Sequence, residues 1–213
     1  MIIRFPQKTR ETFFLHHAKG VLFLSVFTIT MSYFFIDIPL ANYFEHWPHT
    51  WKLPVLWLTD LIDPKENYLV WPILFFFLRF IMKQESWGNR SLLLAISIPM
   101  ANLVTEFMKH IFGRARPELL FTQGIFGFTF FKWANSFLSF PSGHACTIGA
   151  ICGAFAGFWP HRLLPLLFFS LLLAFTRVIL TMHFLSDVIG GLTIGLLISQ
   201  WVYLEMKRQN VQF

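Results

Sequence analysis

Long apolar segments, separated by shorter stretches that hold most of the charged residues, dominate this sequence. Each is nearly free of charge and approaches the ~20 residues that a helix needs to cross the hydrocarbon core of a bilayer. The segments are residues 21–36, 68–82, 91–106, 145–159, 163–176 and 188–204. The pattern therefore predicts an all-α polytopic membrane protein, built as a bundle of six transmembrane helices.

The composition agrees with this interpretation. Of the 213 residues, 55% are hydrophobic, 19% are aromatic and only 13% are charged, which is far from the average of soluble proteins. The sequence has no internal repeat and no low-complexity segment, so we expect a single domain over residues 1–213. The first apolar segment lacks a small-residue cleavage site, and we expect it to remain as a transmembrane helix.

The net charge is +6, but the basic residues fall between apolar segments and form no single basic face. Their positions therefore indicate membrane topology and not a nucleic-acid partner. Six crossings place both termini on one side of the membrane. Ten of the 17 basic residues then share the side of the termini: Arg4, Lys8, Arg10, Lys19, Arg79, Lys83, Arg90, Arg162, Lys207 and Arg208. Of the other seven, three belong to the clusters described below. The excess predicts cytoplasmic termini.

Other features point to packing and anchoring. Cys146 and Cys152 lie in an apolar segment and are expected to be free thiols, since two cysteines make neither a disulfide framework nor a metal cluster. The connections 37–67 and 114–144 are rich in Trp and Phe and are expected at the headgroup level. Glycines at four-residue spacing predict close contact between helices: Gly149, Gly153 and Gly157, and again Gly191 and Gly195.

Three short clusters place cationic and titratable residues beside the predicted spans, all on the same side of the membrane. Such residues are costly there and usually functional. The clusters are Lys109-x6-Arg116-Pro117, Pro141-Ser142-Gly143-His144 and Arg177-x5-His183-x3-Asp187. A single His, Lys or Arg at the end of a span is ordinarily an interfacial or topological residue. We therefore base the prediction on the three clusters together.

The residue types in these clusters suit phosphate chemistry. Lys109, Arg116 and Arg177 supply three positive charges, and a guanidinium matches the oxygens of a phosphate in two-point contact. Ser142 and Gly143 are expected at the start of the fourth helix, where unpaired backbone N–H groups and the helix dipole favour an anion. Together these residues predict an anion pocket.

His183 and Asp187 are four residues apart. If the sixth helix begins near Leu180, their side chains share a face and the carboxylate can accept a hydrogen bond from one ring nitrogen. The other nitrogen is then free to attack, because the carboxylate fixes the tautomer and stabilises the charge that develops on the ring. His144, on another helix, is left to protonate a departing alkoxide.

Three further polar residues lie close to the first cluster. Arg114 and His110 fall within its spacer, and we interpret both as ordinary interfacial charges. For Glu106, we expect a role as the partner of a neighbouring arginine.

The three clusters resemble the signature of the type 2 phosphatidic acid phosphatase family, which is Lys-x6-Arg-Pro, then Pro-Ser-Gly-His, then Ser-Arg-x5-His-x3-Asp. Order and spacing agree, and Thr176 stands where the family has serine. The resemblance covers residues 109–187, and the six-span layout is similar to that of the integral membrane branch. The first hundred residues match it only in general layout.

The resemblance implies an enzyme, a metal-independent lipid phosphate phosphatase without a cofactor. It hydrolyses a phosphomonoester or a diphosphate of a lipid through a phosphohistidine on His183. Asp187 orients that ring, and His144 protonates the leaving group. The remaining residues of the clusters hold the phosphate: Lys109, Arg116, Ser142, Gly143 and Arg177.

The implied partners are a lipid phosphate and the bilayer. In a bacterium, the protein is expected in the inner membrane with its site facing the periplasm. The sequence leaves open the oligomeric state and the lipid, which could be phosphatidic acid, phosphatidylglycerol phosphate, undecaprenyl diphosphate or lipid A 1-phosphate. A lipid phosphotransferase with the same intermediate and a non-catalytic lipid or anion transporter are the alternatives. Vanadium haloperoxidases share the pocket pattern, but they are soluble proteins.

Overall fold

The computed structural model describes residues 7–60 and 64–213, without the side chains of residues 7–17, 49, 60 and 65. Arg4, assigned above to the cytoplasmic side, lies outside the described residues. The elements are α1 (Gln7–Met31), the π-helix η1 (Ser32–Ile36), α2 (Asp37–Glu45), α3 (His49–Asp60), α4 (Pro64–Phe76), the π-helix η2 (Phe77–Ile81), α5 (Glu85–Phe112), α6 (Pro117–Gln123), the 3₁₀ helix η3 (Asn135–Phe137), α7 (Gly143–Phe158), the 3₁₀ helix η4 (Pro160–Arg162), α8 (Leu163–Ile179) and α9 (Leu185–Arg208).

The structure confirms the all-α class over the described residues, where each predicted apolar segment is helical over all or nearly all of its length. In this part of the chain, four helices are long and apolar enough to cross a membrane: Ala18–Glu45, Glu85–Phe112, Pro160–Ile179 and Leu185–Arg208. Helix α7 is apolar but has only 16 residues, about 24 Å of rise against a hydrocarbon core of ~30 Å. The number of six crossings therefore stays a prediction.

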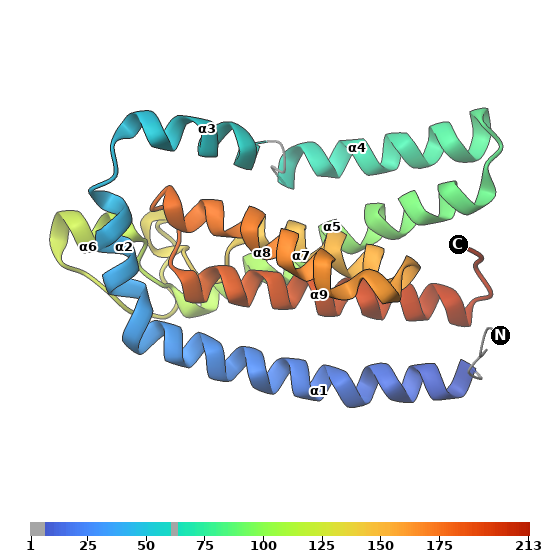
Figure 1. The fold of residues 1–213 in the computed structure, drawn as a ribbon, viewed down its shortest axis with the longest axis horizontal. Helices are drawn as coiled ribbons and strands as arrows, with labels where there is room; N and C mark the ends of the chain where they lie inside the picture. The colour runs from blue at the N-terminus through green and yellow to red at the C-terminus, as the bar shows by residue number, and fades with distance from the viewer. Residues whose placement is uncertain (1–6, 61–63) are drawn as a thin grey trace.

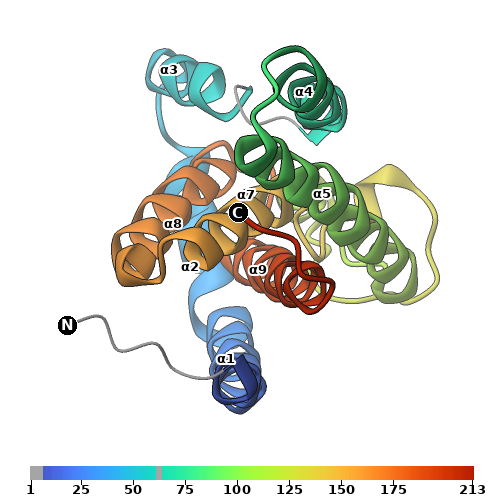
Figure 2. The same cartoon turned by 90° about the vertical axis from the view of Figure 1, so that its right-hand side faces the viewer.

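The long helices run side by side along one axis (Figure 1). The start of α1 and the end of α9 lie at one end of the bundle, while α2, α6 and the segment that joins α5 to α7 lie at the other. Viewed along the axis, α7 and α9 occupy the middle, with α5 and α8 beside them and with α1 on one side and α3 and α4 on the other side outermost (Figure 2). Helix α7 packs against α9, α5 and α8.

The connection 37–67, which was expected at the headgroup level, is largely helical among its described residues. Its second half forms α3, which packs along α8 and is followed by α4 in the same direction (Figure 1). Thr59 near the end of α3 and Thr176 in α8 are joined by a hydroxyl–hydroxyl hydrogen bond of 3.1 Å. The headgroup level of this connection stays a prediction, and the structure shows that Trp51 and Trp57 belong to a helix that packs against α8.

The predicted glycine contacts lie between α7 and α9. A Cβ atom on Gly191 or Gly195 would overlap the carbonyl oxygen of Ser142 or Cys146 on α7, and one on Gly149 would overlap the backbone of α9. The two helices thus meet backbone to backbone, which only glycine permits. This confirms the packing prediction for these positions, and it fixes the start of α7 against the start of α9.

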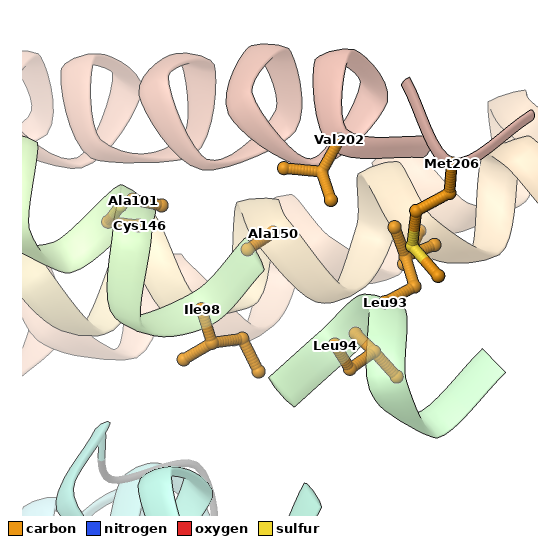
Figure 3. Packing of buried hydrophobic residues seen from close by; sticks show 9 residues of the cluster. Leu93, Leu94, Ile98, Ala101, Cys146, Ala150, Val202 and Met206 are labelled. Carbon is orange, nitrogen blue, oxygen red and sulfur yellow. The ribbon is translucent and has the colours of Figure 1, made fainter. Parts of the chain in front are cut away.

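The apolar core continues from this contact toward the end of the bundle where α9 ends. Side chains from α5, α7 and α9 interlock there (Figure 3): Leu93, Leu94, Ile98, Ala101, Cys146, Ala150, Val202 and Met206. Both cysteines are buried free thiols, as predicted. The core holds the three helices whose opposite ends carry the polar clusters.

Candidate active site

The three clusters gather at one end of the bundle, each at the start or end of a helix. Helix α5 ends at Gly113, whose left-handed φ of 54° and N–H bond to the Lys109 carbonyl stop the helix just before the Arg-Pro pair. Lys109 and Arg177 lie in last turns, Arg116 and Ser142 precede α6 and α7, and Gly143, His144 and Asp187 lie in first turns. His183 lies in the turn between α8 and α9.

Direct contacts join the clusters to one another. The Ser142 N–H donates to the Asp187 carbonyl at 3.0 Å, which links the second cluster to the third. The Nζ of Lys109 lies 3.6 Å from the position that a Cβ on Gly143 would take, which links the first cluster to the second. Segments far apart in the sequence thus meet at one place, with the start of α7 between the other two.

His183 is buried, and its ring is held by a backbone carbonyl. Its Nδ1 lies 2.9 Å from the carbonyl oxygen of Ser139 and 3.6 Å from Oδ2 of Asp187. Because a carbonyl can only accept, Nδ1 must carry the proton, and Nε2 is left with the lone pair. The hydrogen bond expected between His183 and Asp187 is therefore replaced by one to the Ser139 carbonyl, with the carboxylate just behind it.

The start of α9 explains this difference. The helix begins at Leu185 and not near Leu180, so His183 precedes the helix and its ring approaches Asp187 from the preceding turn. Oδ2 of Asp187 accepts from the Phe184 N–H at 2.9 Å and so caps the first turn. Before it, Thr181 adopts a left-handed φ of 54°, a strained conformation for a β-branched residue, and this turns the chain toward His183.

Burial lowers the pKa of His183 from its usual 6.5 to about 4. Asp187 opposes the shift, while the positive charges of Arg116 and Arg177 add to it. The lowered pKa means that the protonated form is disfavoured. The ring is therefore neutral through the range from about pH 5 to pH 8, with Nε2 unprotonated.

A titration can test this directly. In ¹³C-histidine-labelled protein without phosphate, the ring signal of His183, identified by its loss in His183→Asn, is expected to stay constant as the pH falls through 6.5. It should move only near pH 4, because protonation must overcome burial. A midpoint close to 6.5 would show a solvated ring and contradict the buried arrangement.

A buried ionic network behind His183 was missed by the sequence interpretation. Arg114, taken as an interfacial charge, is completely buried. Its NH1 donates to Oδ1 of Asp187 at 2.5 Å and to the Ser186 hydroxyl, and its NH2 donates to Oδ2 of Asp37 at 2.7 Å. Four aromatic rings surround the guanidinium at 4.7 to 5.5 Å: those of Tyr33, Phe126, Phe128 and Phe184.

Thr176, which stands beside Arg177 where the family signature has serine, makes two side-chain hydrogen bonds. Thr176 Oγ1 donates to the Leu173 carbonyl at 2.6 Å and also contacts Thr59. Arg177 itself is buried, and its carbonyl accepts from the His183 N–H at 3.3 Å. The end of α8 is thereby tied to the turn that holds the histidine.

In the first cluster, the positive charge of Lys109 is partly compensated by the carboxylate of Glu106. Lys109 Nζ lies 2.9 Å from Oε2 of Glu106, so the expectation that Glu106 pairs with an arginine was wrong. The two residues are three apart on α5, which brings their side chains together. Of the pair, Glu106 is the more exposed, which leaves the ammonium toward Gly143.

Arg116 borders the open part of the site. Its Nε donates to the Asn135 carbonyl at 3.0 Å. Burial lowers the pKa of Arg116, and nearby carboxylates, first that of Asp187, oppose the shift. A shallow, open depression is lined by Arg116, Glu118, Asn135 and Ser136. The guanidinium thus lies between the buried histidine and the open surface.

The start of α7 offers a buried donor. The Ser142 hydroxyl is completely buried, and it has no hydrogen-bond partner among the described residues. An unsatisfied buried hydroxyl beside the N–H groups of a 16-residue helix is suited to an anion. His144, half-buried, follows in the first turn. Among residues 7–60 and 64–213, no three His, Cys, Asp or Glu side chains gather as metal ligands do.

Comparison with known proteins adds to these observations. The PAP2 superfamily model matches residues 90–210. The lipid A 1-phosphatase of Rhizobium etli is 38% identical over 99 residues, which are 46% of this chain and 43% of that protein. The lipid A 1-phosphatase of Rhizobium johnstonii is 37% identical over 102 residues, or 48% and 42%. The matched part is therefore less than half the length of these curated relatives.

Two solved structures have a similar fold. Aquifex aeolicus LpxE has a TM-score of 0.58 at 19% identity, covering 79% of this chain and 95% of that one. The transmembrane PAP2-type phosphatidylglycerolphosphate phosphatase from Bacillus subtilis has a TM-score of 0.58 at 16% identity, covering 92% and 97%. At these identities the likeness concerns the fold.

Proposed function

The chain belongs to the PAP2 superfamily and is an integral membrane protein, and from this premise we propose that it is a membrane lipid phosphate phosphatase. It hydrolyses a phosphomonoester or a diphosphate of a lipid, and His183 is its nucleophile. The observation that carries the proposal is the setting of His183. Its Nδ1–H is held by the Ser139 carbonyl, so Nε2 keeps a lone pair, and the positive charges of Arg116 and Arg177 act on the ring.

In the proposed reaction, Nε2 of His183 attacks the phosphorus atom and forms the P–N bond while the bond from phosphorus to the lipid oxygen breaks. His144 gives its proton to the departing oxygen. Charge on the phosphoryl oxygens is stabilised by cations and by the start of α7: Lys109, Arg116, Arg177, Ser142 and Gly143. Water then attacks phosphorus and gives a proton to His144 while the P–N bond breaks, which releases inorganic phosphate and restores the neutral His183 ring.

Asp187 acts on the His183 ring, which the Ser139 carbonyl holds in place. Its Oδ2 at 3.6 Å from Nδ1 stabilises the positive charge that the imidazole gains during attack. It is held in place by Arg114, by the Ser139 hydroxyl and by the Phe184 N–H. Asp187 is therefore a positioning and charge-stabilising residue in this proposal, and tautomer selection falls to the Ser139 carbonyl.

The proposed topology has six crossings, with both termini in the cytoplasm and the site at the periplasmic side of a bacterial inner membrane. Figure 1 supports it, because the start of α1 and the end of α9 lie at the end of the bundle opposite to the clusters. The lipid chains then stay in the bilayer while the phosphate reaches Arg116 at the boundary. The open depression beside Arg116 leaves room there for the hydrophilic part of the substrate.

The names of the relatives guide the choice of substrates for a test. Purified protein in detergent is given lipid A, phosphatidylglycerol phosphate, phosphatidic acid and undecaprenyl diphosphate, each with and without a chelator. Released inorganic phosphate is measured without any added acceptor. We expect release from at least one lipid, and we expect the chelator to leave the rate unchanged, because the proposed reaction uses only side chains and water.

The controls separate the alternatives. A phosphotransferase would release little phosphate until an alcohol acceptor is added. A lipid or anion transporter would bind the lipids without turning them over, and such a result would contradict the proposal. Rapid loss of activity with the chelator, restored by one added metal ion, would contradict metal independence alone.

A further inference from the structure

The carboxylate of Asp37 is buried far from the three clusters in sequence but close to them in space. It is 1% exposed and lies at the start of α2, directly after the π-helical turn η1. Oδ1 accepts from the Ser32 hydroxyl at 2.8 Å and from the Ser186 N–H at 3.0 Å, and Oδ2 accepts from Arg114 and from the Ser186 hydroxyl. All its partners are thus donors within the protein.

Arg114 connects this carboxylate to the site. The guanidinium donates one NH2 bond to Asp37 and NH1 bonds to Asp187 and Ser186. Both ion pairs are fully buried, with no exposure of any of the three side chains. Removing one partner of such a network leaves an uncompensated charge, and electrostatic effects are strong there because water does not screen them.

The charges of the three residues do not cancel. With both carboxylates ionised, Asp37 and Asp187 contribute −2 and Arg114 contributes +1, so the group carries a net charge of −1. Arg114 paired with Asp187 alone would be neutral. Asp37 therefore restores the negative charge behind the His183 ring, on the side opposite to the nitrogen that attacks phosphorus.

We propose that Asp37 is a positioning residue for the reaction: through Arg114 it keeps the group behind His183 negative, so that the cationic ring formed during attack is stabilised. This inference rests on the proposed function. The chemistry supports it, because the attacking imidazole becomes positively charged when Nε2 bonds to phosphorus while Nδ1 keeps its proton. A neutral group behind the ring would stabilise that charge less.

The test compares Asp37→Asn with wild type on the lipid that the protein hydrolyses best. The variant is nearly isosteric but makes the group neutral. We expect kcat to fall about tenfold to thirtyfold, while KM and the inhibition constant of inorganic phosphate change less than threefold, because the phosphate-binding cations are untouched. Glu45→Gln, which neutralises an exposed carboxylate on the same helix, is the matched control and should keep kcat within twofold.

A double variant separates the charge effect from a structural role. Asp37→Asn combined with Arg114→Gln removes one charge of each sign and restores the net −1 on Asp187. We expect it to recover kcat to more than one tenth of wild type, although it has lost two ion pairs. A purely structural role predicts the opposite, with the double variant worse than either single one. If Asp37→Asn alone does not fold, the same threshold of one tenth applies to the double variant.

The outcomes are distinct. No turnover by wild type on any lipid would contradict the proposed function. Turnover by wild type with an equal kcat for Asp37→Asn, or a double variant below one tenth of wild type, would overturn only the role of Asp37.

Discussion

Changing His183 to alanine is expected to lower kcat for lipid phosphate hydrolysis by about four orders of magnitude or more, because no other group can form the P–N bond. The ring is buried and carbonyl-anchored, so a neighbouring histidine cannot take its place. The measurement is phosphate release under saturating lipid. Rapid quenching of wild type with ³²P-labelled substrate should also give protein-bound phosphate that is stable to alkali and labile to acid.

The matched control is His110→Ala. His110 lies at the same end of the bundle, where its Nδ1 contacts the Glu106 carbonyl and its ring meets that of Trp133. It has no role in the proposed reaction, and its removal should change kcat less than threefold. If His183→Ala kept turnover within tenfold of wild type, the nucleophile would have to be another residue.

The second large effect is expected on folding. Gly195→Ala should destabilise the protein by more than about 3 kcal/mol, because the new methyl group would overlap the Cys146 carbonyl and the Ala150 nitrogen on α7. Backbone atoms cannot move aside as a flexible side chain can, so α7 and α9 must separate. The measurement is the midpoint of thermal unfolding in detergent, together with the yield of monodisperse protein.

Gly20→Ala makes the same chemical change where there is room. Nothing lies within 4 Å of a Cβ at Gly20 in α1, and alanine is favoured over glycine in a helix by up to about 1 kcal/mol. This variant should unfold at the same temperature as wild type or above it. Equal unfolding midpoints for Gly195→Ala and wild type would mean that α7 and α9 are not in backbone contact.

Much of the architecture could be predicted from the sequence because its signals are local. Apolar segments marked the helices, and glycines four residues apart marked the α7–α9 contact. The meeting of the three clusters was predicted because their residue types together suit one phosphate and because their order and spacing resemble a family signature. The Ser142–Asp187 bond now joins two of those clusters directly. Their roles in catalysis remain predictions.

The remaining features depend on contacts that leave no local pattern. Asp37 and Arg114 are 77 positions apart, and each alone is typical of a span end. The anchor of His183 is a main-chain carbonyl, which any residue at position 139 would supply. The sequence placed the start of this helix near Leu180, whereas α9 begins at Leu185. Phe184 occupies the N-cap position, and phenylalanine is not among the residues that favour that position.

The contact of α7 with α9 has a consequence for how the protein can move. Where α7 and α9 meet at Gly149, Gly191 and Gly195, backbone lies against backbone and no side chain between them could change rotamer, so the helices can neither slide nor hinge there without losing the contact. The two helices therefore form a rigid pair at the centre of the bundle. Movements of the outer helices α1, α3 and α4 would leave this contact intact, because none of the three takes part in it.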